Sequence, residues 1–273
     1  MKTAALALAD FLDRHDNVLL LTGAGISTAS GIPGYRDEEG VRRGRAPIQG
    51  PEFRRQEAVR RRYWARSMVG WKTLAGATPN AGHYAVAELQ AKGRLGNILT
   101  QNVDGLHQRA GTQRVTEMHG SIHLVRCLAC GLQIPRAALQ CRLEALNPQA
   151  LTPQAQPLPD GDAELEPQDL ERFQVPSCSQ CGGVLQPDVV FFGDNLPPAR
   201  TQAILQATQQ ADALLIAGSS LMVYSGYRLC KIAAAAGKPI AAINLGKTRA
   251  DDLLTLKVNR ATEQVLPELA ALL

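Results

Sequence analysis

Four cysteines in two pairs are the side chains of this sequence whose spacing most clearly indicates chemistry. One pair lies in "CLAC" and the other in "CSQCGG", each followed by glycine. Two Cys-x-x-Cys pairs of this kind can hold a tetrahedral Zn²⁺ with four thiolates, a closed and therefore structural site. A redox dithiol or two unrelated pairs are the alternatives. The predicted zinc ligands are Cys127, Cys130, Cys178 and Cys181, whereas Cys141 and Cys230 have no partner motif.

A glycine turn is the second such feature. In "LLLTGAGISTASGIPGYR", residues 19–36, an apolar run enters a Gly-x-Gly turn, which usually delivers a strand end to a phosphate. The dinucleotide fingerprint Gly-x-Gly-x-x-Gly would need glycine at position 28, where the chain has Thr28. A P-loop would need a Gly-Lys-Ser/Thr ending, and no lysine is present. The turn at Gly23, Ala24 and Gly25 therefore fits neither standard pattern.

Small and polar residues follow three further apolar runs, in "TQNVDGLHQRAG", "LLIAGSSLMVYSG" and "IAAINLG". Ligands of open α/β sheets bind at the carboxyl ends of the strands. The first of these stretches could equally be a polar turn whose side chains cap a helix. Each signal is weak alone, but together they predict a dinucleotide site spread over four strand ends. Its candidate residues are Gln101, Asn102, Asp104, Gly218, Ser219, Ser220, Asn244, Leu245 and Gly246.

His119 is the best candidate for a general base. It lies in "TEMHGSIHLVRC", just before the first cysteine pair, where the expected sheet domain passes into an insertion. An imidazole titrates near physiological pH, although a lone histidine is more often structural.

The elements that must position these residues alternate between strands and helices. Apolar runs at 18–21, 95–100, 213–217 and 239–245 alternate with helical spacing at 83–92, 199–210 and 227–236. This alternation predicts an α/β fold, a Rossmann-like parallel sheet with helices on both faces. We expect residues 1–35, 80–118 and 187–273 to form the sheet domain that binds the dinucleotide. Residues 36–79 and 120–186 would form a small helical and zinc-binding domain, with a proline-rich surface loop near 147–167.

The composition is ordinary for a soluble globular enzyme. The 273 residues are 45% hydrophobic and 20% charged, with a formal net charge of +4. No apolar stretch reaches the roughly 18 residues of a membrane span, and nothing indicates export, so we expect a cytoplasmic protein. An arginine cluster between 42 and 66 reads best as a solvated face. A nucleic-acid-binding zinc module would need stacking aromatics, and the chain has only five Phe, five Tyr and two Trp.

Taken together, the motifs resemble the sirtuin family. "GAGISTASGIPGYR", "TQNVDGLH", "MHGSIHLVRC", "PDVVFFGD", "GSSLMVYSG" and "INLG" occur in order around the two cysteine pairs, from about residue 15 to 268. "RYWARSMVGW" and "FQVPSCSQCGG" look like the class II branch, which includes a mitochondrial lipoamidase and ADP-ribosyltransferase.

The resemblance implies an NAD-dependent protein-lysine deacylase or deacetylase that consumes NAD and releases nicotinamide, O-acyl-ADP-ribose and free lysine. Gly23, Ala24 and Gly25 would hold the pyrophosphate, Arg36 would orient NAD, and His119 would be the base, with Asn102 also catalytic. The substrate peptide would add along Val189, Val190, Phe191 and Gly193.

Two points of the resemblance concern specificity. The family usually has Asp after Ile-Pro, where this chain has Gly34, which puts the rate in doubt more than the reaction class. Tyr63 and Arg66, three residues apart in an expected helix, resemble the pair with which some sirtuins bind acidic acyl groups. They could also be a surface pair or part of the arginine cluster. Protein mono-ADP-ribosyltransfer and lipoamidase activity at the same site are the alternative functions, and the sequence defines no oligomeric state.

Overall fold

The computed structural model describes residues 2–44, 46–150 and 171–273. They belong to two compact units, which we treat separately. The first comprises Met1–Arg43, Thr78–Met118 and Pro197–Leu273, and the second comprises Gly44–Ala77 and His119–Leu196. Most of the predicted proline-rich loop, like Arg45 of the arginine cluster, lies outside the described residues.

The first unit is built on a parallel sheet of six strands. In spatial order these are β3 (Val115–Glu117), β2 (Ile98–Thr100), β1 (Val18–Thr22), β7 (Ala213–Ala217), β8 (Ile240–Ile243) and β9 (Leu256–Val258). β1, β7 and β8 are buried along their whole length, which explains why they read as continuous apolar runs. The strand order reverses between β1 and β7, and the ligand crevice of such sheets lies at that point.

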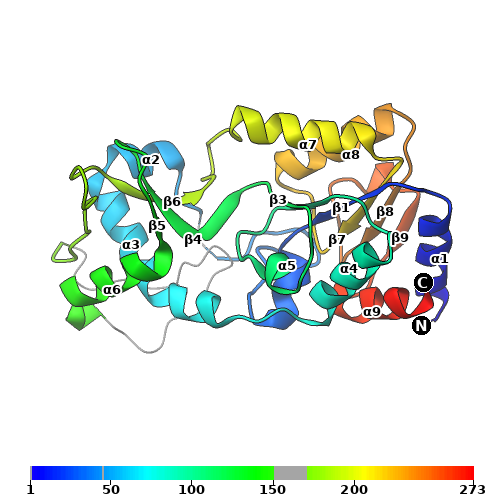
Figure 1. Cartoon of the computed structure of the whole chain (residues 1–273), viewed down its shortest axis with the longest axis horizontal. Coiled ribbons are helices and arrows are strands. Elements are labelled where there is room, and N and C mark those ends of the chain that lie inside the picture. Colours follow the sequence, from blue (N-terminus) through cyan, green and yellow to red (C-terminus); the bar gives the residue numbers. More distant parts are fainter. Residues whose placement is uncertain (1, 45, 151–170) are drawn as a thin grey trace. The chain divides into compact units, whose positions relative to one another are not determined.

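Helices cover both faces of this sheet (Figure 1). α1 (Lys2–Asp13), α4 (Ala81–Ala91) and α9 (Thr262–Leu272) pack together on one face, and α7 (Pro198–Gln210) and α8 (Tyr224–Ala235) lie on the other. Leu8, Leu89 and Leu269 are fully buried with the strand residues of the core. Three shorter helices complete the unit: η1 (Ala24–Ser30), α5 (Leu106–Arg109) and η3 (Asp251–Leu253).

The second unit joins helices to an antiparallel sheet of three strands. The strand order is β5 (Gln133–Pro135), β4 (Gly120–Cys127) and β6 (Leu185–Val189). The helices are α2 (Gly50–Arg55), α3 (Glu57–Gly76), α6 (Arg136–Leu146) and η2 (Pro148–Ala150). Their shared core is aromatic: Phe53 stacks on Phe191 at 5.0 Å between ring centroids, and Tyr63 meets both rings edge to face.

The predicted fold class is confirmed, with two differences in detail. Strands β3 (Val-Thr-Glu) and β9 (Leu-Lys-Val) were not predicted, because each contains polar or charged residues and gives no apolar run. Residues 36–43 lie with the first unit and 187–196 with the second, each opposite to our expectation. The reason is backbone pairing: Lys247 donates to Glu38 O at 2.7 Å, and β6 pairs with β4. The assignment of functions to two domains stays a prediction.

Among the described helices, none combines the length and the apolar character that crossing a bilayer requires.

Candidate active site and metal centre

The glycine turn after β1 packs directly against the turn after β7. Gly25 N–H donates to Gly218 O at 2.7 Å, and Gly23 N–H donates to Ala217 O at 3.2 Å. A Cβ on Gly25 would lie 2.8 Å from Gly218 Cα, closer than real Cβ contacts allow. Gly218 itself has φ +65°, a left-handed conformation that glycine adopts without strain. The two phosphate-binding candidates therefore form one surface at the switch point, and it is made of backbone.

A hydrogen-bonded network of side chains lies behind this turn. Asn102 Nδ2 donates to Gly23 O at 3.1 Å and to Ser27 Oγ at 3.0 Å. Ser27 Oγ donates to Asp104 Oδ2 at 2.7 Å, and the other oxygen of Asp104 accepts from Leu106 N–H at 3.0 Å. Ser27 is fully buried and Asp104 is 5% exposed. This arrangement fixes the amide of Asn102 and the carboxylate of Asp104 in single orientations beside the glycine turn.

Gln101 is held by a different partner. Ser219 Oγ donates to Gln101 Oε1 at 2.6 Å and accepts from Leu221 N–H at 3.2 Å. A Cβ on Gly226 would lie 2.8 Å from Gln101 Nε2, so α8 also restricts the position of the Gln101 side chain. Ser220, next along the turn, is half-buried. The structure thus brings the predicted residues of the first and second polar stretches together.

The third polar stretch meets the segment after the glycine turn. Asn244 Nδ2 donates to Leu245 O at 2.8 Å, and Gly246 N–H donates to Asn259 Oδ1 at 2.7 Å. Gly246, at φ +77°, lies against Glu38 so closely that a Cβ would come within 2.1 Å of Glu38 O.

Arg36 lies in the same segment. Its Nη1 donates to Gly40 O at 2.8 Å, inside a turn closed by the Arg36–Arg42 bridge. A Cβ at Gly34 would meet Arg36 O and Thr28 Cγ2 at 3.7 Å, an ordinary contact. The backbone at Gly34 therefore has room for a Cβ atom.

Two buried histidines support the strand ends and are unsuited to act as bases. His107 Nε2 lies 2.9 Å from Thr22 Oγ1, and Thr22 also donates to Thr100 Oγ1 at 2.9 Å. Burial, and secondarily the proximity of His83, lowers the pKa of His107 to about 3. Burial lowers the pKa of His83 to about 4 against the opposing charge of Asp104. Both rings are neutral at physiological pH.

In the second unit, the four paired cysteines converge. All four Sγ atoms lie within 4.8 Å of one another, with Cys127 to Cys181 at 3.5 Å and Cys130 to Cys178 at 3.8 Å. A tetrahedral site with Zn–S bonds of about 2.3 Å has S–S separations of about 3.8 Å, so the residues fit zinc. A Cβ on Gly183 would lie 2.9 Å from Cys127 Sγ, so the second knuckle requires glycine. The interpretation as two unrelated pairs is wrong.

His119 and the predicted substrate edge also lie in the second unit. His119 O accepts from Val190 N–H at 2.8 Å. β6, which ends at Val189, is one of the two edge strands of its sheet, and Phe192, further along the chain, forms a bridge to Gln49. Gly193 has φ +80° and closes the turn that follows. An edge strand of this kind can pair with an extended peptide.

Tyr63 and Arg66 are both buried in α3, 5% and 6% exposed. The alternative that they form a surface pair, or that Arg66 belongs to a solvated cluster, is wrong. The reason is that α3 is enclosed from Tyr63 to Met68 by the aromatic core and by α6. Arg54, Arg55 and Arg62 are exposed, as expected of the cluster.

Sequence reasoning did not single out two fully buried polar residues. Ser27, which joins Asn102 to Asp104, sits in a motif that we interpreted through its glycines. A serine in an otherwise small and apolar turn was the available signal. Arg136, fully buried in the second unit, had no signal at all, because arginine normally lies at the surface.

Comparisons with known proteins agree with this geometry. The family model described as "Sir2 family" matches residues 23–225. The NAD-dependent protein deacetylase of Bordetella bronchiseptica is 52% identical over 265 residues, 97% of each chain. The mitochondrial NAD-dependent protein lipoamidase sirtuin-4 of Bos taurus is 47% identical over 263 residues, 95% of this chain and 84% of that protein. A solved complex of Sir2 with a p53 peptide and NAD⁺ aligns with a TM-score of 0.75 at 29% identity, covering 95% and 94% of the chains.

The matched residues include the glycine turn, the Asn102–Asp104 network and all four cysteines. The chain therefore belongs to the Sir2 family.

Proposed function

We infer that this chain is an NAD-dependent protein deacetylase, the activity named for a relative 52% identical over 97% of each chain. The observation that carries the inference is the backbone surface formed by Gly25 and Gly218 at the switch point of the sheet. The absence of Cβ atoms there lets a pyrophosphate approach the backbone closely at the carboxyl ends of the strands. The four clustered cysteines would hold a structural Zn²⁺ that orders the second unit.

We assign roles to the chain's residues on this basis. Gly23, Ala24 and Gly25 bind the pyrophosphate, and Asn244 with Gly246 binds the adenosine ribose. Gln101, Asn102 and Asp104 line the ribose and nicotinamide pocket, where Ser27 holds two of them in place. Arg36 orients the dinucleotide.

NAD⁺, when bound, would supply an electrophilic ribose carbon, to which the acyl oxygen of the substrate bonds as nicotinamide leaves. His119 then accepts a proton from a ribose hydroxyl, which makes that oxygen a nucleophile toward the acyl carbon. The edge after β6, from Val189 to Gly193, holds the acylated peptide by strand addition.

The experiment is nicotinamide release from NAD⁺ with an acetyl-lysine peptide, followed by intact mass. A deacetylase removes the acetyl group only when NAD⁺ is present, whereas an ADP-ribosyltransferase adds the mass of ADP-ribose to the protein substrate. A peptide whose mass stays unchanged both with and without NAD⁺ would contradict the assignment. The lipoamidase alternative, favoured by the Bos taurus relative, is tested with a lipoyl-lysine peptide in the same assay.

We further propose that acyl chains ending in a carboxylate, such as glutaryl, are substrates. The support is that Tyr63 and Arg66 are both buried on α3, where a guanidinium can bind a carboxylate bidentately and a phenol adds a third hydrogen bond. A charged hydrogen bond of about 1.5–3 kcal/mol predicts that Arg66→Met lowers glutaryl-lysine turnover about tenfold to hundredfold. Acetyl-lysine turnover should stay near that of the wild type. An equal loss on both peptides would mean that Arg66 only supports the helix.

The compartment is also a proposal. Thiolates that hold zinc persist in reducing surroundings, which favours the cytoplasm.

A further inference from the structure

Arg136, the first residue of α6, is fully buried between two tryptophans of α3. Its Cζ lies 5.4 Å from the Trp64 ring centroid and 4.9 Å from that of Trp71. Nη2 donates to Ser67 O at 3.3 Å and to Ser67 Oγ at 3.1 Å. Residues 64, 67 and 71 share one face of a helix. A guanidinium thus occupies a position in the contact between α3 and α6 where an apolar side chain would be expected.

The same guanidinium has donors with no acceptor. Within the described part of the chain, nothing accepts from Arg136 Nε or Nη1, and nothing accepts from the buried Trp64 Nε1 either. Buried polar groups are nearly always hydrogen-bonded, and an unmet donor costs free energy. Gln140 lies one turn further along α6. Its Nε2 is itself a donor, to Met68 O and to Glu144 Oε1, so it cannot accept a hydrogen bond from Arg136. Its Oε1 also lacks a partner in the described residues.

The charge here is positive. Burial lowers the pKa of Arg136 to about 10, against the opposing influence of Tyr63 and Glu144, so the group stays protonated at neutral pH. The carboxylate of Glu144 is shared, because it accepts from Gln140 at 2.9 Å and lies 3.3 Å from Lys72 Nζ. Arg66, which lies on α3, is a second buried cation of this unit.

Ring contacts connect this position to the proposed substrate edge. The Tyr63 ring lies 5.4 Å from Phe191 on the edge and 5.1 Å from Trp64, both edge to face. Trp64 in turn lies against Arg136. Tyr63 is therefore shared between the predicted acyl-binding pair and the donors around Arg136.

We infer that Arg136 and Trp64 Nε1 form a second anchor for the terminal carboxylate of an acidic acyl chain, beyond Tyr63 and Arg66. A carboxylate only accepts hydrogen bonds, which complements a group of donors. This inference rests on the proposed deacylase function, which it deepens by adding specificity residues to the acyl site.

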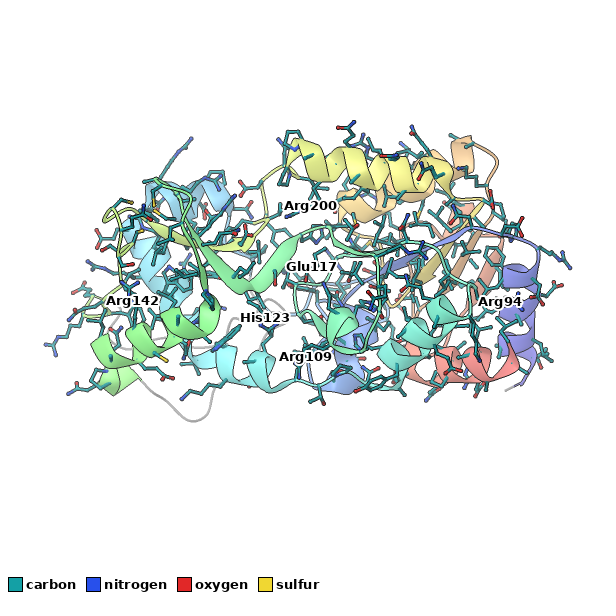
Figure 2. The ribbon with its side chains drawn as sticks, in the orientation of Figure 1. Arg94, Arg109, Glu117, His123, Arg142 and Arg200 are labelled. Atoms are coloured by element: carbon teal, nitrogen blue, oxygen red, sulfur yellow. The ribbon has the colours of Figure 1, made fainter. Side chains whose placement is uncertain are left out.

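The test compares three peptides: acetyl-lysine, glutaryl-lysine, and the terminal amide of glutaryl-lysine, which matches its length without its charge. Arg136→Met should lower kcat/KM on glutaryl-lysine about tenfold to hundredfold and leave the other two within about twofold. Trp64→Phe keeps an aromatic ring at this position and removes the indole N–H donor, so it should give a smaller loss of the same selectivity. Arg142→Met is the matched control, since Arg142 lies on the same helix and donates to Ser177 O (Figure 2). It should change none of the three.

Melting temperature and zinc content report on folding. Removing a buried cation that serves a ligand should leave the melting temperature unchanged or raise it. An equal loss on all three peptides, or a wild type that prefers the amide to glutaryl-lysine, would overturn the inference while leaving deacetylation intact. If Arg136→Met fails to fold, an unselective Trp64→Phe would also overturn it. Absence of turnover on every peptide would instead contradict the proposed function.

Discussion

The two candidate sites of this chain are built from opposite materials. At the strand ends of the first unit, the surface is backbone, because Gly25 and Gly218 approach too closely for either to carry a Cβ. In the second unit, the metal centre consists of four side-chain sulfur atoms within 4.8 Å of one another. The first site would be damaged by adding one methyl group, and the second by replacing one atom. The effect of a substitution therefore depends on whether it alters the backbone surface or a metal-binding side chain, more than on its distance from the reacting atoms.

The largest effect is expected at the metal centre. Cys178→Ser removes one thiolate, and structural zinc contributes on the order of 10 kcal/mol of folding free energy at such sites. The variant should lose stoichiometric zinc and the cooperative unfolding of the second unit. Metal analysis and thermal unfolding measure both. Cys141→Ser, at an exposed cysteine, is the control and should keep its zinc. Wild-type protein purified without stoichiometric metal would contradict the assignment.

His119→Ala removes a side chain that belongs neither to the glycine surface nor to the cysteine cluster, so both should stay intact. Removal of a general base costs about 10²–10⁴-fold in rate, so nicotinamide-coupled deacetylation should fall by that factor at unchanged zinc content and melting temperature. His123→Ala is the matched control, since that histidine lies on β4 against the Trp71 ring at 5.4 Å (Figure 2). Near-full turnover by His119→Ala would mean that another group is the base.

Gly218→Ala adds a single methyl group to the backbone-built site. The Cβ would lie 2.3 Å from Ile26 N, at a residue with φ +65°. A left-handed conformation costs a non-glycine residue about 1–2 kcal/mol, and overpacking adds about 1–3 kcal/mol. Thermal unfolding and the KM for NAD⁺ should both show the damage. Gly237→Ala, at φ +69° with nothing within 4 Å of its Cβ, isolates the first cost. Equal destabilisation of the two variants would show that the close approach does not matter.

The smallest effect concerns acid. The folded-state pKa values of His83 and His107 are lowered to about 4 and about 3, so the unfolded chain binds protons first as the pH falls below about 6.5. Stability is therefore complete above that pH and declines toward pH 4, by about 1–2 kcal/mol for each group at pH 5. Urea unfolding at pH 7.5 and pH 5 measures the loss. Equal urea midpoints at the two pH values would refute the expectation.

The sequence alone determined the features that depend on local spacing. Two Cys-x-x-Cys pairs predicted the metal cluster because each pair supplies two thiolate ligands from one tight turn. Strands β7 and β8 were predictable because a strand buried on both faces must be apolar throughout. The polar residues at the strand ends could be grouped because parallel strands bring their carboxyl ends to one edge.

Only the tertiary structure decided the features that depend on partners far apart in the chain. Ser27 became the joint between Asn102 and Asp104 through contacts 75 and 77 residues distant. Arg66 and Arg136 are of a residue type that normally lies at the surface. They are buried because α3 and α6 pack around them. A residue's type fixes what it can bond, but long-range packing fixes whether water or protein supplies the partner. Burial of a charge is therefore a property of the fold and cannot be read from local sequence.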